Sequence, residues 1–371
     1  MNFAERMDEI DTSSIRRLFE LAAQMKNPIN LAAGQPDFNV PELIKQNAAQ
    51  AIHNNQNRYV PAPGIALLRE EIHRYLKNEG VQTQDILVTA GASGALVLAL
   101  LALADKHTDV YLVDPYFISY IPMVQLTEAK IHFIDTYTNN FKLSPKILEN
   151  AFSKIKKTTR RKILIFNSPV NPTGVAYSET EIAALAKVTK KHRVQVISDE
   201  VYEHFCFDFA HSSWLKADSS AVLVRTFGKS WGMPGWRIGY AAGPSKIVQK
   251  MTALHQLLYV CVPAAFQEAA ALALKTPMPE ILEIFRRRRD KVYQALRNDF
   301  ELAKPQGTFY AFVKIPNGNK KFIQKCLKEE LLIVPGNVFS QKNTHFRLSF
   351  AVDDQILGKG MEMLIKLARS K

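Results

Sequence analysis

Cysteine is scarce in this sequence of 371 residues, and long apolar runs are missing from it. The three cysteines, Cys206, Cys261 and Cys326, are odd in number and lack the spacing of zinc ligands, so we expect a reducing cytoplasm, no disulfide framework and no metal site. The longest apolar run, residues 95–104 (ALVLALLALA), falls short of the roughly 20 residues that a membrane helix needs. Residues 1–11 (MNFAERMDEID) are charged and have no apolar core, so we expect neither a signal peptide nor a membrane partner.

Acidic residues are outnumbered, since 48 lysines and arginines against 35 aspartates and glutamates give a formal net charge of +13. Such an excess suits nucleic acid or an anionic surface, and it equally suits a protein that binds phosphates and carboxylates. The basic residues are scattered, apart from runs at 154–162 (KIKKTTRRK) and 286–289 (RRRR). Charge runs of this kind are typical of a solvated face, so we expect no specific nucleic-acid partner.

Strands and helices alternate through the middle of the chain. The expected strands cover residues 85–90, 109–115, 129–135, 162–169, 194–200 and 221–227, and the expected helices cover 91–103, 123–129, 145–155 and 179–192. Two amphipathic helices, 43–53 and 65–76, are expected before this series. The alternation predicts an α/β fold with a doubly wound, mostly parallel sheet.

The two ends of the chain follow a different pattern. Residues 14–25 (SIRRLFELAAQM) have helical apolar spacing, and residues 279–300 read as one long helix. Short strands are expected at 308–315, 331–339 and 344–351. We therefore expect a large domain over residues 31–278 and a smaller α+β domain made of residues 1–30 and 279–371, joined by the long helix.

Polar residues follow the expected strands at the points where these strands end. Asn171 and Lys229 come just after a strand, Asp199 lies at the end of one with Tyr202 after it, and a small-residue turn at 91–94 (GASG) opens a helix. The free N–H groups of such a helix start suit a phosphate. In a doubly wound sheet, ligands bind at the carboxyl ends of the strands. Taken singly, each residue is more typical of a salt bridge or a helix cap.

Together these residues supply an amine, a carboxylate, a phenol, an amide and a phosphate turn. That set matches the aldehyde, pyridinium nitrogen, phenolic oxygen and phosphate of pyridoxal 5'-phosphate. A lysine forms the Schiff base with this cofactor, and an acidic residue pairs with its ring nitrogen. The sequence therefore predicts a pyridoxal-phosphate site at this edge of the sheet.

Six segments, in one order and at one spacing, resemble the class I and II aminotransferases, which are the fold-type I pyridoxal-phosphate enzymes. They are 31–38 (LAAGQPDF), 58–72 (RYVPAPGIALLREEI), 168–174 (SPVNPTG), 197–204 (ISDEVYEH), 226–240 (TFGKSWGMPGWRIGY) and 346–351 (FRLSFA). One segment alone would be weak evidence, but six that cover nearly the whole chain are specific. The sequence looks most like the branch with aspartate, aromatic, kynurenine and methionine aminotransferases.

The resemblance implies catalytic roles for residues around the cofactor ring. Lys229 would form the Schiff base and then move the substrate proton, while burial and the cationic Arg237 lower its pKa. Asp199 would pair with the pyridinium nitrogen. Asn171 and Tyr202 would hydrogen-bond the phenolic oxygen of the ring.

The resemblance also implies roles for residues around the phosphate and the substrate. Phe117 would stack on the cofactor ring. Tyr59 would reach the phosphate in a partner subunit, so we expect a homodimer. The phosphate itself would be held by Ala92, Ser93, Thr226 and Arg237, and the amino-acid substrate by Gly34, Asn171 and Arg347.

The implied reaction is the ping-pong transfer of an amino group from an L-amino acid of aromatic, neutral or aspartate type to a 2-oxo acid. Aspartate-preferring members carry a lysine in the phosphate turn where this chain has Ser93, which favours aromatic or neutral donors over aspartate. The same scaffold also carries carbon–sulfur β-lyases, so that activity stays open as an alternative. A further alternative is a non-catalytic binding or regulatory relative, to which only the net charge of +13 points.

Overall fold

The computed structural model describes residues 27–154, 160–316 and 321–370, together with Ala4, Met7, Ile10 and Met25. The helix expected at 14–25 therefore lies outside the described residues, except for Met25, and so does most of the basic run at 154–162. Of the helices in the described part, none combines the length and the apolar character that crossing a membrane requires.

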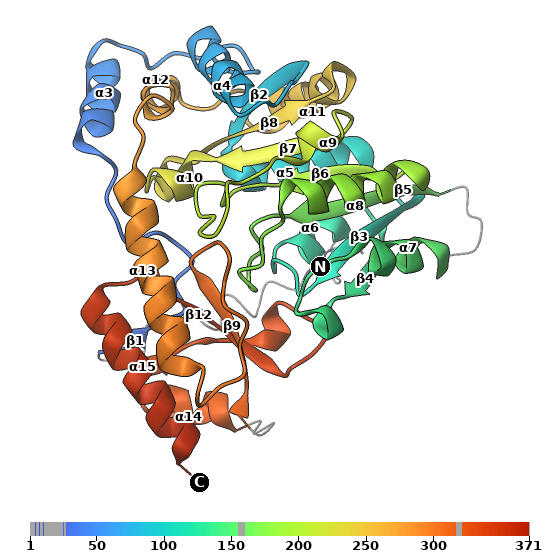
Figure 1. Cartoon of the computed structure of the whole chain (residues 1–371). Coiled ribbons are helices and arrows are strands. Elements are labelled where there is room, and N and C mark those ends of the chain that lie inside the picture. Colours follow the sequence, from blue (N-terminus) through green and yellow to red (C-terminus); the bar gives the residue numbers. More distant parts are fainter. Residues whose placement is uncertain are drawn as a thin grey trace.

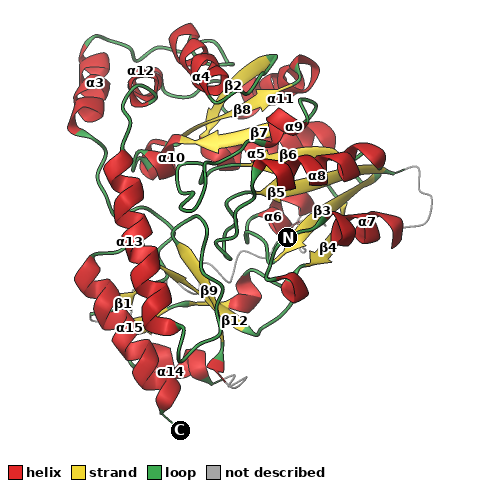
Figure 2. Ribbon diagram, viewed as in Figure 1, coloured by secondary structure: helices red, strands yellow, loops and turns green. Residues whose placement is uncertain are grey.

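A seven-stranded sheet forms the middle of the molecule, with strand order β2-β8-β7-β6-β5-β3-β4 (Figure 2). Its strands are β2 (Asp85–Ala90), β3 (Thr108–Asp114), β4 (Lys130–Asp135), β5 (Arg161–Asn167), β6 (Gln195–Asp199), β7 (Val222–Thr226) and β8 (Ile238–Gly243). All neighbours are parallel except β8, which is antiparallel to β2 and β7. The predicted α/β class with a mostly parallel sheet is confirmed, although β8 was not among the expected strands.

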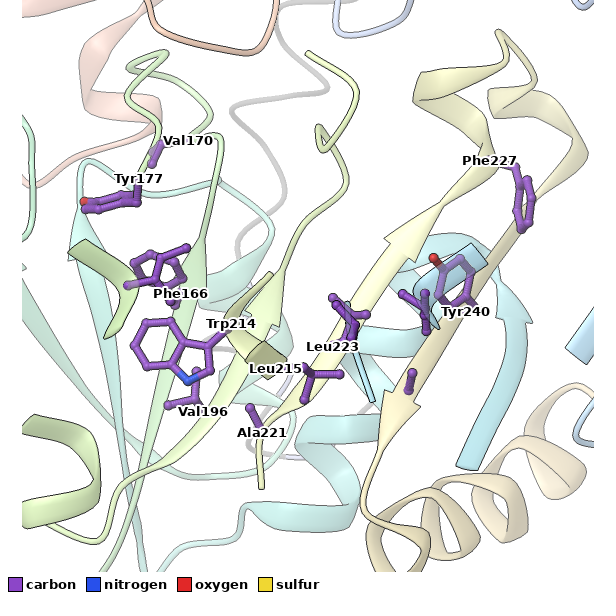
Figure 3. Close-up of a cluster of buried hydrophobic side chains, with 14 of the residues drawn as sticks. Phe166, Val170, Tyr177, Val196, Trp214, Leu215, Ala221, Leu223, Phe227 and Tyr240 are labelled. Carbon is purple, nitrogen blue, oxygen red and sulfur yellow. The ribbon is translucent and has the colours of Figure 1, made fainter. Parts of the chain in front are cut away.

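Helices cover both faces of this sheet, which is why its strands are apolar on both sides. One face packs against α5 (Gly91–Leu103), α6 (Tyr120–Gln125) and α11 (Ser245–Leu258). The other packs against α3 (Glu42–His53), α4 (Ala66–Asn78), α7 (Pro145–Lys154), α8 (Glu179–Lys191), α9 (Trp214–Ala217) and α12 (Ala264–Ala273). Figure 3 shows the core of this second face, where Phe166, Trp214 and Leu223 are buried. Successive residues of a strand point to opposite faces of the sheet, so neighbours in the chain lie in different cores.

A smaller sheet, of order β11-β12-β9, lies beside the large one. Its strands are β9 (Tyr310–Lys314), β11 (Val334–Pro335) and β12 (His345–Ser349), and a separate pair joins β1 (Ile29–Asn30) to β10 (Leu331–Leu332). The helices of this part are α13 (Pro279–Leu296), α14 (Phe322–Lys328) and α15 (Asp354–Arg369). Figure 1 shows α13 running from the side of the large sheet down to the small one. The division into domains of 31–278 and of 1–30 with 279–371 stays a prediction.

Helix α13 differs from its expectation in two ways. It ends at Leu296, because the amide of Asp299 turns back to the Leu296 carbonyl, so it does not reach residue 300. The arginine run at 286–289 is not simply a solvated face, since Arg288 and Arg289 are buried. Consecutive helical residues point about 100° apart, so a run of four must turn part of itself inward. Arg288 pairs there with Asp37 and Asp354, and Arg289 pairs with Asp208 and Asp290.

Candidate active site

A cavity of about 580 Å³ opens where β5, β6 and β7 end, facing the small sheet. It is lined by nearly all of the site residues expected from the sequence: Gly34, Ala92, Ser93, Phe117, Asn171, Asp199, Tyr202, Thr226, Lys229, Arg237 and Arg347. Tyr59 is the exception, because it lies outside the cavity with 84% of its surface exposed. The structure thus brings together residues that are up to 313 positions apart, and their roles stay predictions.

The start of α5 forms one end of the cavity. No side chain caps this helix, so its first N–H groups are free for a ligand. Gly91 has φ of 70°, and a Cβ atom there would lie 2.7 Å from Nη2 of Arg237. Only glycine therefore lets the guanidinium lie against the turn. Free amides, the hydroxyl of Ser93 and the cation of Arg237 make a cradle that fits a phosphate.

Thr226 connects this cradle to the short helix α10 (Phe227–Ser230). Its hydroxyl caps α10 by accepting from the amide of Gly228 and donates to the carbonyl of Ile238. The cap starts the turn that carries Lys229 toward the middle of the cavity.

Lys229 has an amine suited to act as nucleophile or base. Its Nζ donates to the carbonyl of Gly34. Burial, and after it the nearby cations Arg347 and Arg237, together lower the pKa of Lys229 to about 8. The direction agrees with the expectation from the sequence, which named burial and Arg237 and overlooked Arg347. A lysine with this pKa is partly neutral near physiological pH, as covalent chemistry with an aldehyde requires.

Asp199, at the end of β6, is 3% exposed. Burial raises the pKa of Asp199 to about 6, although the hydroxyl of Tyr120, which donates to Oδ2 at 2.6 Å, lowers it. The carboxyl group is therefore mostly ionised at pH 7, which suits a cationic ring nitrogen. Sequence reasoning missed Tyr120. It follows Phe117 by three residues, close to one helical turn, and the two rings meet edge to face at 5.5 Å, so the segment 114–120 held a signal for it.

Two further residues of the cavity were not predicted. Asn167 donates from Nδ2 to the carbonyl of Asp199, and its Oδ1 accepts from the amide of Asn171, so it joins the ends of β5 and β6. Tyr310, on β9, accepts a hydrogen bond of 3.3 Å from the hydroxyl of Tyr202. The bonds of Asn167 to Asp199 and of Tyr202 to Tyr310 depend on how distant segments meet, and the sequence held no local signal for them.

Arg347, on β12, is a buried cation without an acidic partner in the described part of the chain. Its Nη1 donates to Oδ1 of Asn171, its Nη2 donates to the carbonyl of Ala32, and its Nε has no hydrogen-bond partner among the described residues. The guanidinium lies 4.2 Å from the ring centre of Tyr310 and 4.6 Å from that of Phe339. Burial lowers the pKa of Arg347. A buried guanidinium in such a cavity calls for an anionic ligand, and a carboxylate fits it.

The rest of the cavity wall is mainly apolar. Among the described lining residues the cations are Lys229, Arg237 and Arg347, and the acid is Asp199. Apolar side chains come from several elements: Leu96, Phe117, Ile118, Ile323, Leu327, Ile333, Val338 and Phe339. The described cavity therefore offers one cradle for a phosphate, one amine and one clamp for a carboxylate.

Comparison with known proteins agrees with this inventory. The sequence profile described as "Aminotransferase class I and II" matches residues 26–364. A probable aspartate aminotransferase of Methanocaldococcus jannaschii is 33% identical over 376 residues, which cover 97% of this chain and 98% of that protein. Aromatic-amino-acid aminotransferase 2 of Thermococcus litoralis is 31% identical, with 100% of this chain and 99% of that protein covered. The crystal structure of the Rhizobium meliloti aspartate aminotransferase matches with a TM-score of 0.92 at 30% identity, covering 99% of both chains.

Proposed function

The chain belongs to the class I and II aminotransferases, and from this premise we propose that its amino donor is a neutral or aromatic L-amino acid and its acceptor a 2-oxo acid. As predicted from the sequence, it is a pyridoxal-phosphate-dependent aminotransferase of fold type I. The relatives are named as aminotransferases, so neither a carbon–sulfur lyase nor a non-catalytic regulator is favoured.

The cations of the cavity carry the donor proposal. Of these cations, Lys229 would hold the cofactor through its aldehyde, Arg237 would hold its phosphate, and Arg347 would hold the α-carboxylate of the substrate. No further cation among the described lining residues is left for a second carboxylate. Ser93 stands where aspartate-preferring members have a lysine, and the wall beyond Arg347 is apolar. A neutral side chain suits this wall, because a carboxylate there would be buried unpaired.

The residues of the cavity divide the chemistry between them. Bound pyridoxal phosphate supplies the aldehyde that takes up the amino group and the ring that accepts the electron pair of Cα. Arg347 orients the substrate through its α-carboxylate, and the neutral amine of Lys229 takes the proton from Cα. Asp199, held by Tyr120, keeps a negative charge beside the ring nitrogen. Ala92, Ser93, Thr226 and Arg237 would hold the phosphate, Phe117 would stack on the ring, and Asn171 and Tyr202 would bind its phenolic oxygen.

The active unit in this proposal is a homodimer in the cytoplasm. Tyr59 is exposed outside its own cavity, which leaves it free to reach the phosphate of a partner subunit. Leu257 and Leu258 are also exposed at the end of α11, and Val260 beyond them has φ of 62°, unusual for a β-branched residue. Exposed apolar groups and a strained backbone support a contact surface there. The described cysteines are all free, which fits a reducing compartment.

The donor proposal is tested by half-reactions with single amino acids. Enzyme loaded with pyridoxal phosphate is mixed with phenylalanine, methionine, leucine, aspartate or glutamate without any oxo acid, and the 2-oxo acid formed is measured. The neutral and aromatic donors should each yield close to one equivalent per site, and aspartate should react at least about tenfold more slowly. Ser93→Lys is the matched variant and should speed up aspartate. A wild-type enzyme that reacts fastest with aspartate contradicts the proposal.

A further inference from the structure

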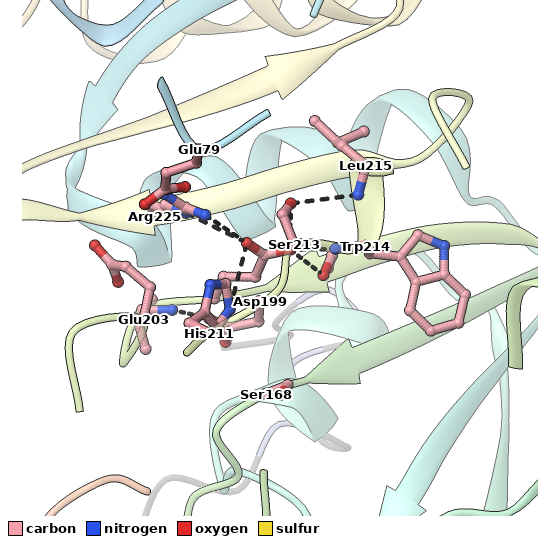
Figure 4. A network of polar contacts seen from close by, with 12 residues as sticks. Glu79, Ser168, Asp199, Glu203, His211, Ser213, Trp214, Leu215 and Arg225 are labelled. Atoms are coloured by element: carbon pink, nitrogen blue, oxygen red, sulfur yellow. Dashed lines mark hydrogen bonds and ion pairs between the residues drawn. The ribbon is translucent and has the colours of Figure 1, made fainter. Parts of the chain in front are cut away.

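A second charged cluster lies behind the ends of β6 and β7, and Figure 4 shows Arg225 within it, beside Glu79 and the groups around Ser213. Arg225 is completely buried. Its Nη1 donates to Oε2 of Glu79 at 2.7 Å, and its Nη2 and Nε donate to Oε2 of Glu200 at 3.0 and 3.3 Å. None of these three residues lines the cavity. The proposed reaction makes no use of them.

The backbone joins this cluster directly to the cofactor site. Asp199 and Thr226 line the cavity, and Glu200 and Arg225 are their immediate neighbours in the chain. Neighbouring residues of a strand point to opposite faces, so the ion pair lies on the far side of the same two strand ends. The amide of Glu200 also donates to the carbonyl of Val224 at 2.9 Å, which extends the contact of β6 with β7. A shift of the pair would therefore move Asp199 and Thr226.

Glu200 accepts hydrogen bonds at both carboxylate oxygens. Burial raises the pKa of Glu200, whereas Arg225, the amide of Trp214 and the hydroxyl of Ser198 lower it and so favour the anion. Oε1 of Glu200 accepts from the hydroxyls of Ser198 and Ser213 and from the amide of Trp214, each at 2.9 Å. Nε2 of His211 is 3.7 Å from Oε2, but burial lowers the pKa of His211 to about 3, so this ring is neutral. Within the described part of the chain, Arg225 is thus the permanent cation that balances Glu200.

The charge of Glu200 bears on Asp199. Burial raises the pKa of Asp199, and the negative charge of Glu200 raises it further. The titratable groups around Asp199 and the ion pair come from several elements: Tyr75, Glu79, Tyr120, Tyr202, Glu203, His211, Lys229 and Tyr240. Without its cation, Glu200 would make it harder to keep a second carboxylate ionised next to it.

We propose that Arg225 is a positioning residue, which fixes the ends of β6 and β7 through Glu200 and balances the charge of Glu200, so that Asp199 stays in place as an anion for the ring nitrogen of the cofactor. This rests on the proposed role of Asp199. It does not depend on which amino acid is the donor.

The test is a pH titration of the visible absorption of the enzyme loaded with pyridoxal phosphate, without substrate, together with the Kd of the cofactor. The acid limb of this titration is the absorption change at low pH, which in this proposal reports the protonation of Asp199. Arg225→Met should move the acid limb to higher pH by about one unit and raise the Kd of the cofactor about tenfold. Glu200→Gln removes a negative charge beside Asp199 and should move the limb downward. The double variant should return toward the wild type, and Arg225→Lys, which keeps the charge, should restore much of the wild-type limb.

Arg289→Met is the matched control, because Arg289 is also a buried, ion-paired arginine and does not line the cavity. It should lower stability and leave the acid limb unchanged. If Arg225→Met does not fold, Glu200→Gln decides, since Arg225 then still pairs with Glu79. Any one of three results would overturn the proposal. They are an unchanged acid limb in Glu200→Gln, equal shifts of the limb in Arg225→Met and Arg289→Met, and shifts of the same sign in Arg225→Met and Glu200→Gln. The donor half-reactions are measured separately, so an incorrect donor assignment would not change the interpretation of these pH shifts.

Discussion

Two buried arginines, Arg347 and Arg225, lie on opposite sides of the same strand ends and have opposite surroundings. Arg225 is paired with two carboxylates. Around Arg347 the described residues supply an amide oxygen, a backbone carbonyl and two aromatic rings, and they leave its Nε–H group without a partner. A buried charge without a counter-charge costs several kcal/mol, so a fold keeps one where a ligand supplies the counter-charge. We infer that the charge of Arg225 stabilises the fold, whereas the charge of Arg347 binds a substrate.

The pKa values follow the same division. In the cavity, burial lowers the pKa of Lys229 to about 8 and raises that of Asp199 to about 6, both toward the neutral form. For Arg225, burial alone lowers the pKa, yet the carboxylates of Glu79 and Glu200 raise it above the ordinary value. Buried groups without an ion-pair partner in the described chain are therefore the ones poised for chemistry.

The largest effect is expected at Lys229. Lys229→Met removes the amine that attaches the cofactor and takes the substrate proton, so turnover should fall by about 10⁴-fold or more. Absorption spectra and mass spectrometry check whether the cofactor is still attached covalently. Turnover close to that of the wild type would contradict the division between structural and functional charged groups, because the neutral amine of Lys229 would then have no function.

The next effect is expected at Arg347. Arg347→Met removes the clamp for the α-carboxylate, so kcat/KM for the amino acid should fall about 100-fold, mostly through a higher KM. Steady-state kinetics measure it, and Arg369→Met, which removes an exposed arginine paired with Asp299, is the control. An unchanged KM would mean that Arg347 does not bind substrate.

Much of this site could be predicted from the sequence, because its charged residues follow strand ends. Lys229, Asp199 and Asn171 were found in that way. Tyr120 was missed although it follows Phe117 by about one helical turn, and Tyr310 was missed because its role depends on which segments meet across the cavity. The pairing of Arg225 was equally hidden, because its partner Glu79 is 146 positions away at the end of α4.

The fold shows the same limit. The alternation of strands and helices predicted the α/β class, but β8 was missed because its sequence, IGYAAG, is short and rich in small residues. Its antiparallel place between β2 and β7 arises from long-range pairing. The buried Arg288 and Arg289 were assigned to a solvated face because a charge run does not reveal that carboxylates come from distant segments.

A third prediction concerns the cost in folding stability of burying the Lys229 amine without a counter-charge, and it is tested on the protein without cofactor. The folded pKa of Lys229 is about 8 against an ordinary value of 10.5, so the folded apoprotein is destabilised below pH 8 and this cost disappears as the pH rises to 10.5. Apo Lys229→Met should therefore be more stable than the wild type at pH 7, by on the order of 3 kcal/mol, and no more stable near pH 10.5. Urea unfolding at several pH values measures the difference. A difference that does not change with pH would contradict the lowered pKa.

The smallest effect is expected at Tyr120. Tyr120→Phe removes the hydrogen bond that lowers the pKa of Asp199, so that pKa should rise above its value of about 6. The acid limb of the cofactor absorption should move to higher pH, and the Kd of pyridoxal phosphate should rise by roughly fivefold to tenfold, the net worth of one typical hydrogen bond. A limb displaced to lower pH would reverse the assignment of donor and acceptor.

The most direct test of the division compares the free energies of unfolding of apo Arg347→Met and apo Arg225→Met at pH 7. Arg225→Met leaves Glu200 buried without its cation and should lose about 3 kcal/mol or more. Arg347→Met removes a buried charge that no acidic residue of the described chain balances, so it should stay within about 1 kcal/mol of the wild type or be more stable. Equal losses in the two variants would show that Arg347 is structural, and the account of the cavity would fail.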